Sequence, residues 1–250
     1  MKTLYLECNM GAAGDMLMAA LYELLPPAEQ AVFLDAMGRL LPGVEVTPKR
    51  AVTCGIAGTH MEVTVRGEEE RSRDVALGRG GESMHDHEHE TGEDEARHQH
   101  EHRHPDHDHG QGHDHHHDHV HDHSHDHGHH HVHSHTAPAE IAAILEGLDA
   151  PAEVKAAARA VYDRIAAAES AAHGVPVEQI HFHEVGSLDA VADVAGVCLA
   201  LHLLGPDRIA ASPVHLGGGQ IHCAHGVVPV PAPATARLLE GIPCYTGEIR

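Results

Sequence analysis

Histidine is concentrated in one stretch of this sequence. Of its 31 histidines, 23 lie between His85 and His135, interleaved with acids in patterns such as HDHSHDH. Neutral imidazole binds Ni, Cu, Zn and Co, and neighbouring carboxylates lower the cost of gathering cations. The tract therefore predicts many overlapping weak sites that buffer metal, nickel among them; a zinc buffer or a plain solvated linker is the alternative. Its candidate ligands include His113, His115, His117, His119, His121 and His123.

Two short motifs outside the tract pair metal-ligating side chains at a spacing of two. In HFHEVG, His181 and His183 would share one face of an extended chain, and Glu184 follows as a possible ligand or base. In CAHG, Cys223 and His225 have the same spacing. The two pairs could converge on one nickel or zinc ion. The alternatives are a polar strand end with satisfied histidines and a glycine-rich loop with an incidental thiol.

An acidic pair lies in a segment that is otherwise apolar. Asp189 and Asp193 are four residues apart and so share one helical face, along which Gly196 and Ala200 leave room for another backbone or a ligand. A charge within a buried helix needs a partner, which predicts a hard-metal or acid/base site. The alternative, a favourable interaction with the helix dipole, suits Asp189 but not Asp193.

The segment ECNMGAAGD combines a glycine-containing turn with a helix start. Free backbone amides around Gly11 and Gly14 could bind phosphate. Asp15 would repel phosphate unless a divalent cation bridged them. Asp15 could instead be an ordinary first-turn acid of the helix.

The first half of the chain must position this turn. A short strand is expected over residues 3–6, before the glycine turn. Apolar spacing predicts helices over residues 15–25 and 30–41, separated by Pro26-Pro27. Alternation predicts strands over residues 44–52 and 61–66, with Gly55 and Gly58 in the turn between them.

The second half must position the remaining motifs. Helices are expected over residues 138–148, 151–173, 187–204 and 233–240, and short strands near 208–214, 220–223 and 242–245. Within the 151–173 helix, the predicted buried stripe consists of Val154, Ala158, Val161, Ile165 and Ala168. The 187–204 helix is apolar nearly all round, so we expect it to be deeply buried.

Helices that interleave with strands predict an α/β or α+β fold, with helices layered on a mixed sheet. Residues 67–135 contain almost no apolar side chains and cannot offset the entropy cost of ordering. We therefore expect residues 1–66 and 136–250 to form one α/β domain, interrupted by a disordered, acidic and histidine-rich insertion.

Composition excludes several classes of function. A net charge of −22 argues against nucleic acid and anionic membranes as partners and suits cations. No signal-peptide core and no apolar run of about 20 residues is visible. Five scattered cysteines without a CxxC pair are typical of reduced thiols, so a cytoplasmic protein is expected. Lys2, Lys49 and Lys155 lie outside any GxxxxGK[ST] motif, which excludes a P-loop GTPase.

Three ordered blocks resemble the LarC family of nickel-insertion proteins. They are TLYLECNMGAAGDM, HGVPVEQIHFHEVGSLDAVADVAG and ASPVHLGGGQIHCAHGVVPVPAPATARLLEG. A histidine-rich insertion between the first two blocks is also familiar in that family. The sequence departs from the family at Glu7, where Asp is common, and at Ala12-Ala13, where the turn often contains Ser.

The resemblance implies a specific reaction. LarC-type proteins are CTP-dependent nickel chelatases, of the lyase class. They insert nickel into pyridinium-3,5-bisthiocarboxylic acid mononucleotide and make the nickel-pincer cofactor of lactate racemase-type enzymes. Nickel ends on two thiocarboxylate sulfurs and one ring carbon. The implied requirements are nickel, CTP, a divalent cation (Mg or Mn), a phosphate grip and a base for the ring proton.

The resemblance also implies partners. Family members continue into a C-terminal part, fused or separate, which this chain is expected to need for activity. An apo lactate racemase-like enzyme would receive the cofactor, and a homo-oligomer is expected. Candidate catalytic residues are Glu184, Asp189 and Asp193. The other class of function is a non-catalytic nickel storage or delivery protein, for which the histidines alone would suffice.

Overall fold

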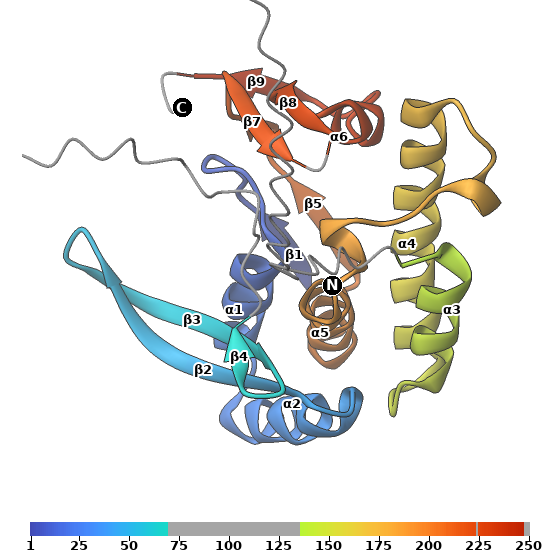
Figure 1. The fold of residues 1–250 in the computed structure, drawn as a ribbon. Coiled ribbons are helices and arrows are strands. Elements are labelled where there is room, and N and C mark those ends of the chain that lie inside the picture. The colour runs from blue at the N-terminus through green and yellow to red at the C-terminus, as the bar shows by residue number, and fades with distance from the viewer. Residues whose placement is uncertain (70–135, 224, 248–250) are drawn as a thin grey trace, which may run out of the picture. The chain divides into compact units, whose positions relative to one another are not determined.

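A computed structural model describes residues 1–69, 136–223 and 225–247 of the chain. The described residues on both sides of the segment 70–135 belong to one compact unit. Its helices pack in series, α1 on α5, α5 on α4 and α4 on α3 (Figure 1). The helices are α1 (Gly14–Leu24), α2 (Pro27–Leu40), α3 (Pro138–Gly147), α4 (Ala152–His173), α5 (Leu188–Leu204) and α6 (Pro233–Leu238), with 3-10 turns η2 (Val177–Gln179) and η3 (Glu184–Gly186).

The strands confirm the expected mixture of helix and sheet. The prediction of one mixed sheet is wrong for the described residues, in which four small sheets form: β1-β5 and β6-β9 are parallel, and β2-β3-β4 and β7-β8 are antiparallel. The strands are β1 (Thr3–Leu6), β2 (Val44–Thr53), β3 (Ile56–Val65), β4 (Glu68–Glu69), β5 (Arg208–Ala211), β6 (Val214–Leu216), β7 (Gln220–Cys223), β8 (Gly226–Pro229) and β9 (Cys244–Thr246).

The single strand predicted over residues 208–214 is divided at Pro213. Proline has no N–H for the ladder, and the Ser212 hydroxyl accepts the Cys8 N–H at 2.8 Å in place of a backbone carbonyl. Pairing resumes where the His215 N–H donates to the Cys8 carbonyl at 3.0 Å. The first and third sequence blocks are therefore joined beside the glycine turn.

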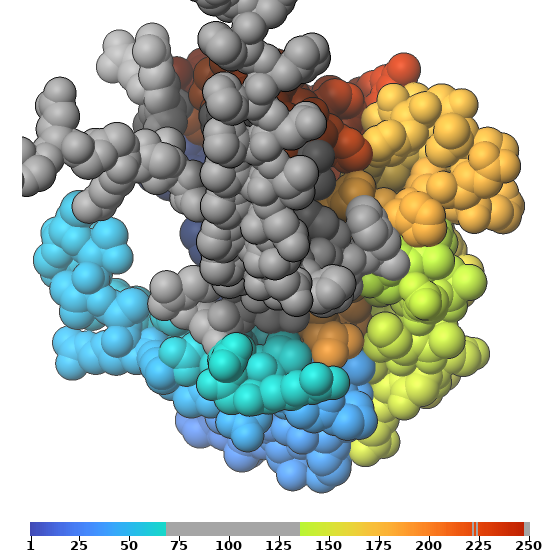
Figure 2. All heavy atoms as spheres, viewed as in Figure 1, coloured from blue at the N-terminus to red at the C-terminus, as the bar shows by residue number. Residues whose placement is uncertain are grey.

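The β2–β3 hairpin is longer than predicted. Its turn consists of Cys54 and Gly55 alone, both with positive φ (52° and 81°), which suits a two-residue hairpin loop. Gly58 lies within β3 and not in the turn, so that prediction is wrong. The exposed distal end of the hairpin extends away from the helices (Figures 1 and 2). Of the predicted insertion, residues 67–69 are described and include β4; residues 70–135 lie outside the described residues.

Helix α4 confirms its predicted ends and three residues of its predicted buried stripe, Val154, Ala158 and Ala168. Pro151 precedes it, and Gly174 caps its C-terminus in the left-handed region (φ 69°). Tyr162 and Ala166 are buried in place of the predicted Val161 and Ile165: Tyr162 is 3% exposed, whereas Val161 is 38% exposed. Tyr162 can be buried because its hydroxyl donates to the Val185 carbonyl at 3.0 Å.

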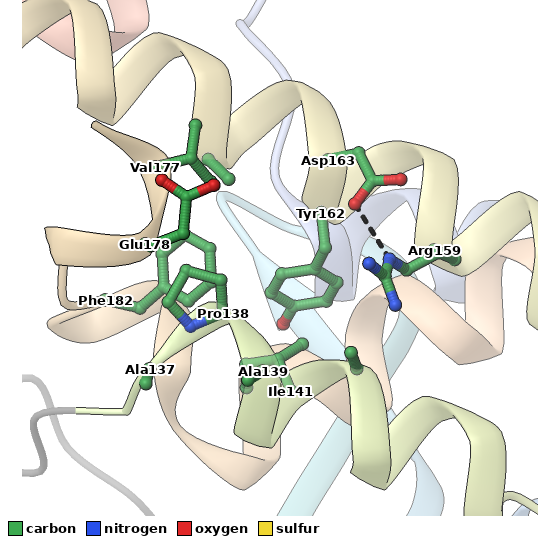
Figure 3. A pocket seen from close by; sticks show the side chains of 12 residues that line it. Ala137, Pro138, Ala139, Ile141, Arg159, Tyr162, Asp163, Val177, Glu178 and Phe182 are labelled. Carbon is green, nitrogen blue, oxygen red and sulfur yellow. Dashed lines mark hydrogen bonds and ion pairs between the residues drawn. The ribbon is translucent and has the colours of Figure 1, made fainter.

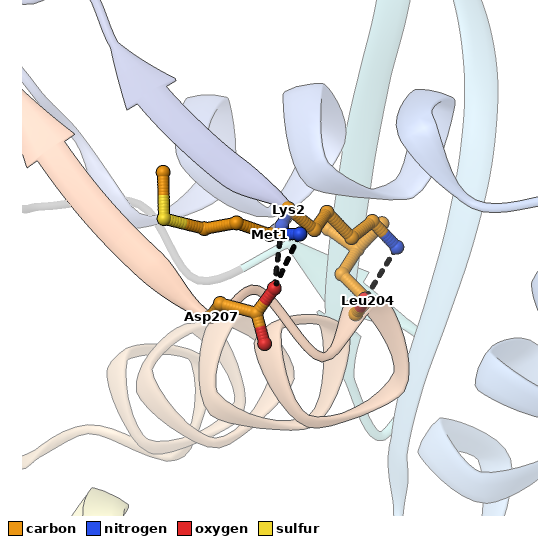
Figure 4. Close-up of polar contacts among 4 residues, drawn as sticks. All are labelled: Met1, Lys2, Leu204 and Asp207. Carbon is orange, nitrogen blue, oxygen red and sulfur yellow. Dashed lines mark hydrogen bonds and ion pairs between the residues drawn. The ribbon is translucent and has the colours of Figure 1, made fainter.

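Helix α5 forms the centre of the core, as its composition predicts. An ideal Cβ on Gly196 would lie 2.4 Å from the Met18 sulfur and 3.1 Å from Met37 Cε. The space beside Gly196 is therefore filled by side chains of α1 and α2, which lets these helices approach closely. At the C-terminal end of α5, Lys2 donates through Nζ to the Leu204 carbonyl and through its backbone N–H to Asp207, each at 2.5 Å (Figure 4).

In the described ranges, no helix combines the length and the apolar character that crossing a bilayer requires.

Candidate functional site

The glycine turn and the acidic pair, far apart in the sequence, meet where α1 begins. An ideal Cβ on Gly14 would lie 2.7 Å from Asp193 Oδ2. Any larger residue at this position would displace the Asp193 side chain. Two independently predicted motifs, Gly14 and Asp193, are thus brought into contact by the packing of α1 against α5.

Asp193 caps α1 from another helix. The residue before α1, Ala13, offers no side-chain cap, and the Asp193 carboxylate accepts the Asp15 backbone N–H instead. This N–H is one of those that a helix start leaves without an internal partner. At the turn, Gly11 has φ 83° and donates its N–H to the Cys8 carbonyl at 3.1 Å. Asp193 therefore contacts the helix start at which phosphate binding is predicted.

Three carboxylates gather around this contact, and we call Asp15, Asp189 and Asp193 the carboxylate cluster. Burial first, and then the charges of Asp15 and Asp189, raise the pKa of Asp193 from 3.8 to about 7, against the opposing effect of the Asp15 N–H. Asp193 Oδ1 is buried and has no hydrogen-bond partner among the described residues. The Asp193 carboxylate therefore takes or gives up a proton near neutral pH.

Asp189 is held by its own helix start. Its Oδ1 accepts hydrogen bonds from the Ser187 hydroxyl and from the Ala190 N–H, the latter at 2.7 Å. These hydrogen bonds hold the Asp189 side chain in place, and its charge contributes to the raised pKa of Asp193. The dipole interaction considered for Asp189 alone fits this position in the first turn of α5.

Sequence reasoning missed Tyr162. Burial first, and then the charges of Asp189 and Asp193, raise the pKa of its hydroxyl well above the ordinary value. The hydroxyl therefore remains protonated and donates to Val185. The available signal was the i, i+4 row of α4 that continues through position 162, in which Tyr162 replaces the predicted Val161 and Ala166 replaces the predicted Ile165.

Glu184 lies at the first position of η3 and is exposed. Its backbone carbonyl lies 2.8 Å from the Ser187 hydroxyl oxygen, a contact that links η3 to the start of α5. Glu184 is thus tied through the main chain to the segment that positions Asp189. Its role as ligand or base stays a prediction.

The two histidine-containing motifs are brought together in part. The His183 and His225 rings lie 4.8 Å apart, and His173, which was not predicted as a ligand, lies 4.8 Å from His225. His181, which is separated from His183 in the sequence by the buried Phe182, is exposed. Cys223 is half-buried, with its sulfur 3.5 Å from the Gly226 carbonyl. Across residues 1–69, 136–223 and 225–247, no three His, Cys, Asp or Glu side chains are already arranged to hold a metal ion.

A cavity of about 430 Å³ opens between α3, α4 and η2 (Figure 3). Apolar side chains such as Pro138, Tyr162 and Phe182 line it, and the Arg159–Asp163 ion pair borders it. No predicted site residue lines this cavity. The six tract ligands, His113, His115, His117, His119, His121 and His123, lie outside the described residues.

Neighbouring half-buried carboxylates and neighbouring imidazoles are the side-chain types that bind and exchange metal ions. The chain belongs to the nickel insertion protein family, whose model matches residues 4–250. It is 32% identical over its whole length to the pyridinium-3,5-bisthiocarboxylic acid mononucleotide nickel insertion protein of Clostridium kluyveri, of which it covers 50%. It is 31% identical over 249 residues to the protein of the same name from Geobacillus kaustophilus, of which it covers 47%.

A shorter match is closer. Over 100 residues, 40% of this chain, it is 48% identical to the nickel insertion protein of the same name from Staphylococcus saprophyticus, of which it covers 26%. The chain spans about half the length of the curated relatives that it matches from end to end. No solved structure matches it.

Proposed function

We propose that this chain is the N-terminal portion of an enzyme that inserts nickel into pyridinium-3,5-bisthiocarboxylic acid mononucleotide, making the nickel-pincer cofactor of lactate racemase-type enzymes. The match to the nickel insertion family over residues 4–250 carries the proposal. Relatives that align with the whole chain are named for this reaction. The carboxylate cluster supplies a chemical reason to place part of the reaction here.

Asp193 is the proposed base. Bonding nickel to a ring carbon requires that carbon to lose its proton, and an effective general base has a pKa near the working pH. The pKa of Asp193, about 7, meets this condition, whereas an ordinary carboxylate would be too weak a base. Asp189 would keep the proton affinity of Asp193 high, and Glu184 would lie at the edge of the site.

The glycine turn is the proposed phosphate grip. The Gly11 and Asp15 N–H groups are held by the Cys8 carbonyl and by Asp193, so the backbone amides that lie between them, up to Gly14, would face the phosphate of the mononucleotide. A divalent cation such as Mg or Mn, expected from the family along with CTP, would remove the repulsion between phosphate and Asp15. Asp15, in the first turn of α1, is a carboxylate that fits such a cation chemically. Asp15 would hold the cation, and Asp193 would remain the base.

Nickel is the substrate metal, and its proposed supply is the histidine tract. His113, His115, His117, His119, His121 and His123 would exchange nickel with the motif ligands His181, His183, Cys223 and His225. The remaining partners are proposed from the family alone. They are the C-terminal LarC part, which would handle CTP, an apo lactate racemase-like enzyme and further copies of the chain.

The test is metallation by the full-length protein, followed by mass spectrometry of the pincer product. Asp193→Asn should lower the insertion rate about 100-fold or more, because it removes the base. Asp163→Asn is the matched control, since Asp163 is exposed and paired with Arg159. Equal rates for the wild type and Asp193→Asn would reject Asp193 as the base.

Nickel storage is the second candidate, favoured by the 23 histidines between His85 and His135. Deletion of that tract separates the two functions. An enzyme should keep single-turnover insertion when nickel is in excess. A storage protein should lose its function along with the tract.

A further inference from the structure

Three imidazoles from separate parts of the sequence meet at one surface. His173 is the last residue of α4, His183 directly precedes η3, and His225 lies in the turn between β7 and β8. We call them the imidazole cluster. The His225 ring lies 4.8 Å from each of the other two, at interplanar angles of 59° and 83°. Local sequence spacing relates no two of these residues, so the fold alone brings them together.

The ring spacing suits shared coordination of one metal ion. Imidazole nitrogens bind a divalent metal at roughly 2.0–2.1 Å, which places each ring centre about 3.2 Å from the ion. At ligand angles of roughly 90–109°, two such ring centres lie about 4.5–5.2 Å apart. Both separations from His225 fall in this range.

Glu169 orients the His173 ring. Its Oε2 lies 3.4 Å from His173 Nε2, one helical turn away, and its side chain is only 23% exposed. A metal-binding histidine commonly gives its second N–H to a carboxylate, which fixes the tautomer and the ring direction. A proton on Nε2 leaves the Nδ1 of His173 as the metal-binding nitrogen.

The location favours a cation. The C-terminus of a helix carries partial negative charge, and α4 ends at His173 because Gly174 adopts the left-handed conformation (φ 69°). The His173 side chain is 35% exposed, and His225 is also exposed. An ion can therefore reach the cluster from solvent.

We infer that His173, His183 and His225 bind a single Ni²⁺ ion as a surface acceptor site, with Glu169 as a positioning residue. The inference rests on the proposed function, since it specifies where that function receives its metal. It differs from the predicted ligand set in including His173 and in requiring neither His181 nor Cys223.

The test measures protection of individual histidines in the full chain. Carbethoxylation of each histidine is followed by peptide mass spectrometry while a chelator buffers free Ni²⁺. In the wild type, His173, His183 and His225 should become protected together, at one common nickel concentration. The exposed His202, at the end of α5, should stay reactive and serves as internal control.

Variants separate a shared ion from three independent histidines. His173→Ala should raise the nickel concentration that protects His183 and His225 at least tenfold, and His225→Ala should do the same for His173 and His183. Glu169→Gln should raise it roughly 10- to 100-fold, the usual effect of losing an orienting partner. His202→Ala should leave the transition unchanged, and circular dichroism checks folding of every variant.

Separate transitions in the wild type, or an unchanged transition in His173→Ala, would overturn the inference. The outcome is independent of the metallation assay. Joint protection without cofactor metallation would reject the proposed function and keep the site. Metallation without joint protection would reject the imidazole cluster as a nickel site and keep the proposed function.

Discussion

The carboxylate cluster and the imidazole cluster are assembled in opposite ways. Asp15, Asp189 and Asp193 meet inside the α1–α5 contact, where burial makes one of them hold its proton to about pH 7. The three imidazoles meet at the ends of elements, where His173 and His225 are exposed to solvent and His183 is half-buried. Packing controls proton affinity in the first region, whereas accessibility controls metal binding in the second.

This contrast divides the proposed chemistry. A fixed, partly desolvated carboxylate suits proton transfer, because its basicity depends on surroundings that must not relax. Surface histidines suit metal capture and release, because they exchange with solvent and with other histidines. Changes in the first region should therefore alter stability as well as chemistry, and changes in the second should alter metal affinity alone.

The largest expected effect tests whether the α1–α5 contact is as tight as the carboxylate cluster requires. Gly196→Ala should destabilise the protein by about 2–3 kcal/mol, because its Cβ would overlap the buried Met18 sulfur. Gly38→Ala is the control, since Gly38 lies in α2 with nothing within 4 Å of an added Cβ. It should be neutral or stabilising by up to about 1 kcal/mol. Urea unfolding measures the free energy of unfolding of both variants. Equal changes would show that the α1–α5 contact can adjust to the added methyl group.

The next effect tests the proton held by Asp193. Its pKa is raised in the folded protein, so the wild type should lose stability as pH rises from about 4 to 7. Asp193→Asn removes that loss. Relative to the wild type it should gain about 2 kcal/mol at pH 8, after allowance for partial exposure, and nothing at pH 4. The free energy of unfolding of both proteins is measured across this pH range. A difference between the variant and the wild type that does not change with pH would contradict the raised pKa.

The smallest effect concerns the tyrosine beneath the cluster. Tyr162→Phe leaves the Val185 carbonyl without its donor and should cost about 1 kcal/mol of stability. Tyr22→Phe is a control on α1, since the Tyr22 hydroxyl makes no hydrogen bond with the described residues. Both are measured by thermal unfolding. An unchanged stability for Tyr162→Phe would mean that water replaces the hydroxyl.

Much of the local structure could be predicted from short-range patterns. The helices around residues 15–25, 138–148, 151–173 and 187–204 were expected from apolar spacing and from end signals such as Gly174. The division of the expected sheet could not be predicted in the same way. It depends on Ser212 and Pro213 meeting Cys8, which is some 200 residues away.

The candidate site likewise contains residues that the sequence predicted and residues that it did not. Residue type and spacing pointed to Gly14, Asp189, Asp193, His183 and His225. Carboxylates and imidazoles that recur at a spacing of two or four residues are typical of functional sites. Spacing did not select Tyr162 or His173. The importance of each depends on a neighbour in another element, Val185 for the first and His225 for the second.

The sequence by itself determined which chemistry is available: imidazoles and a thiol for a borderline metal, acids for a proton and glycines for a close approach. Only the tertiary structure decided which of these groups act on one another. Asp193 has a pKa near 7 because α5 places it against the start of α1, between two other acids. Proton affinity and shared coordination depend on through-space distance and burial, and neither is a property of neighbouring positions in a chain.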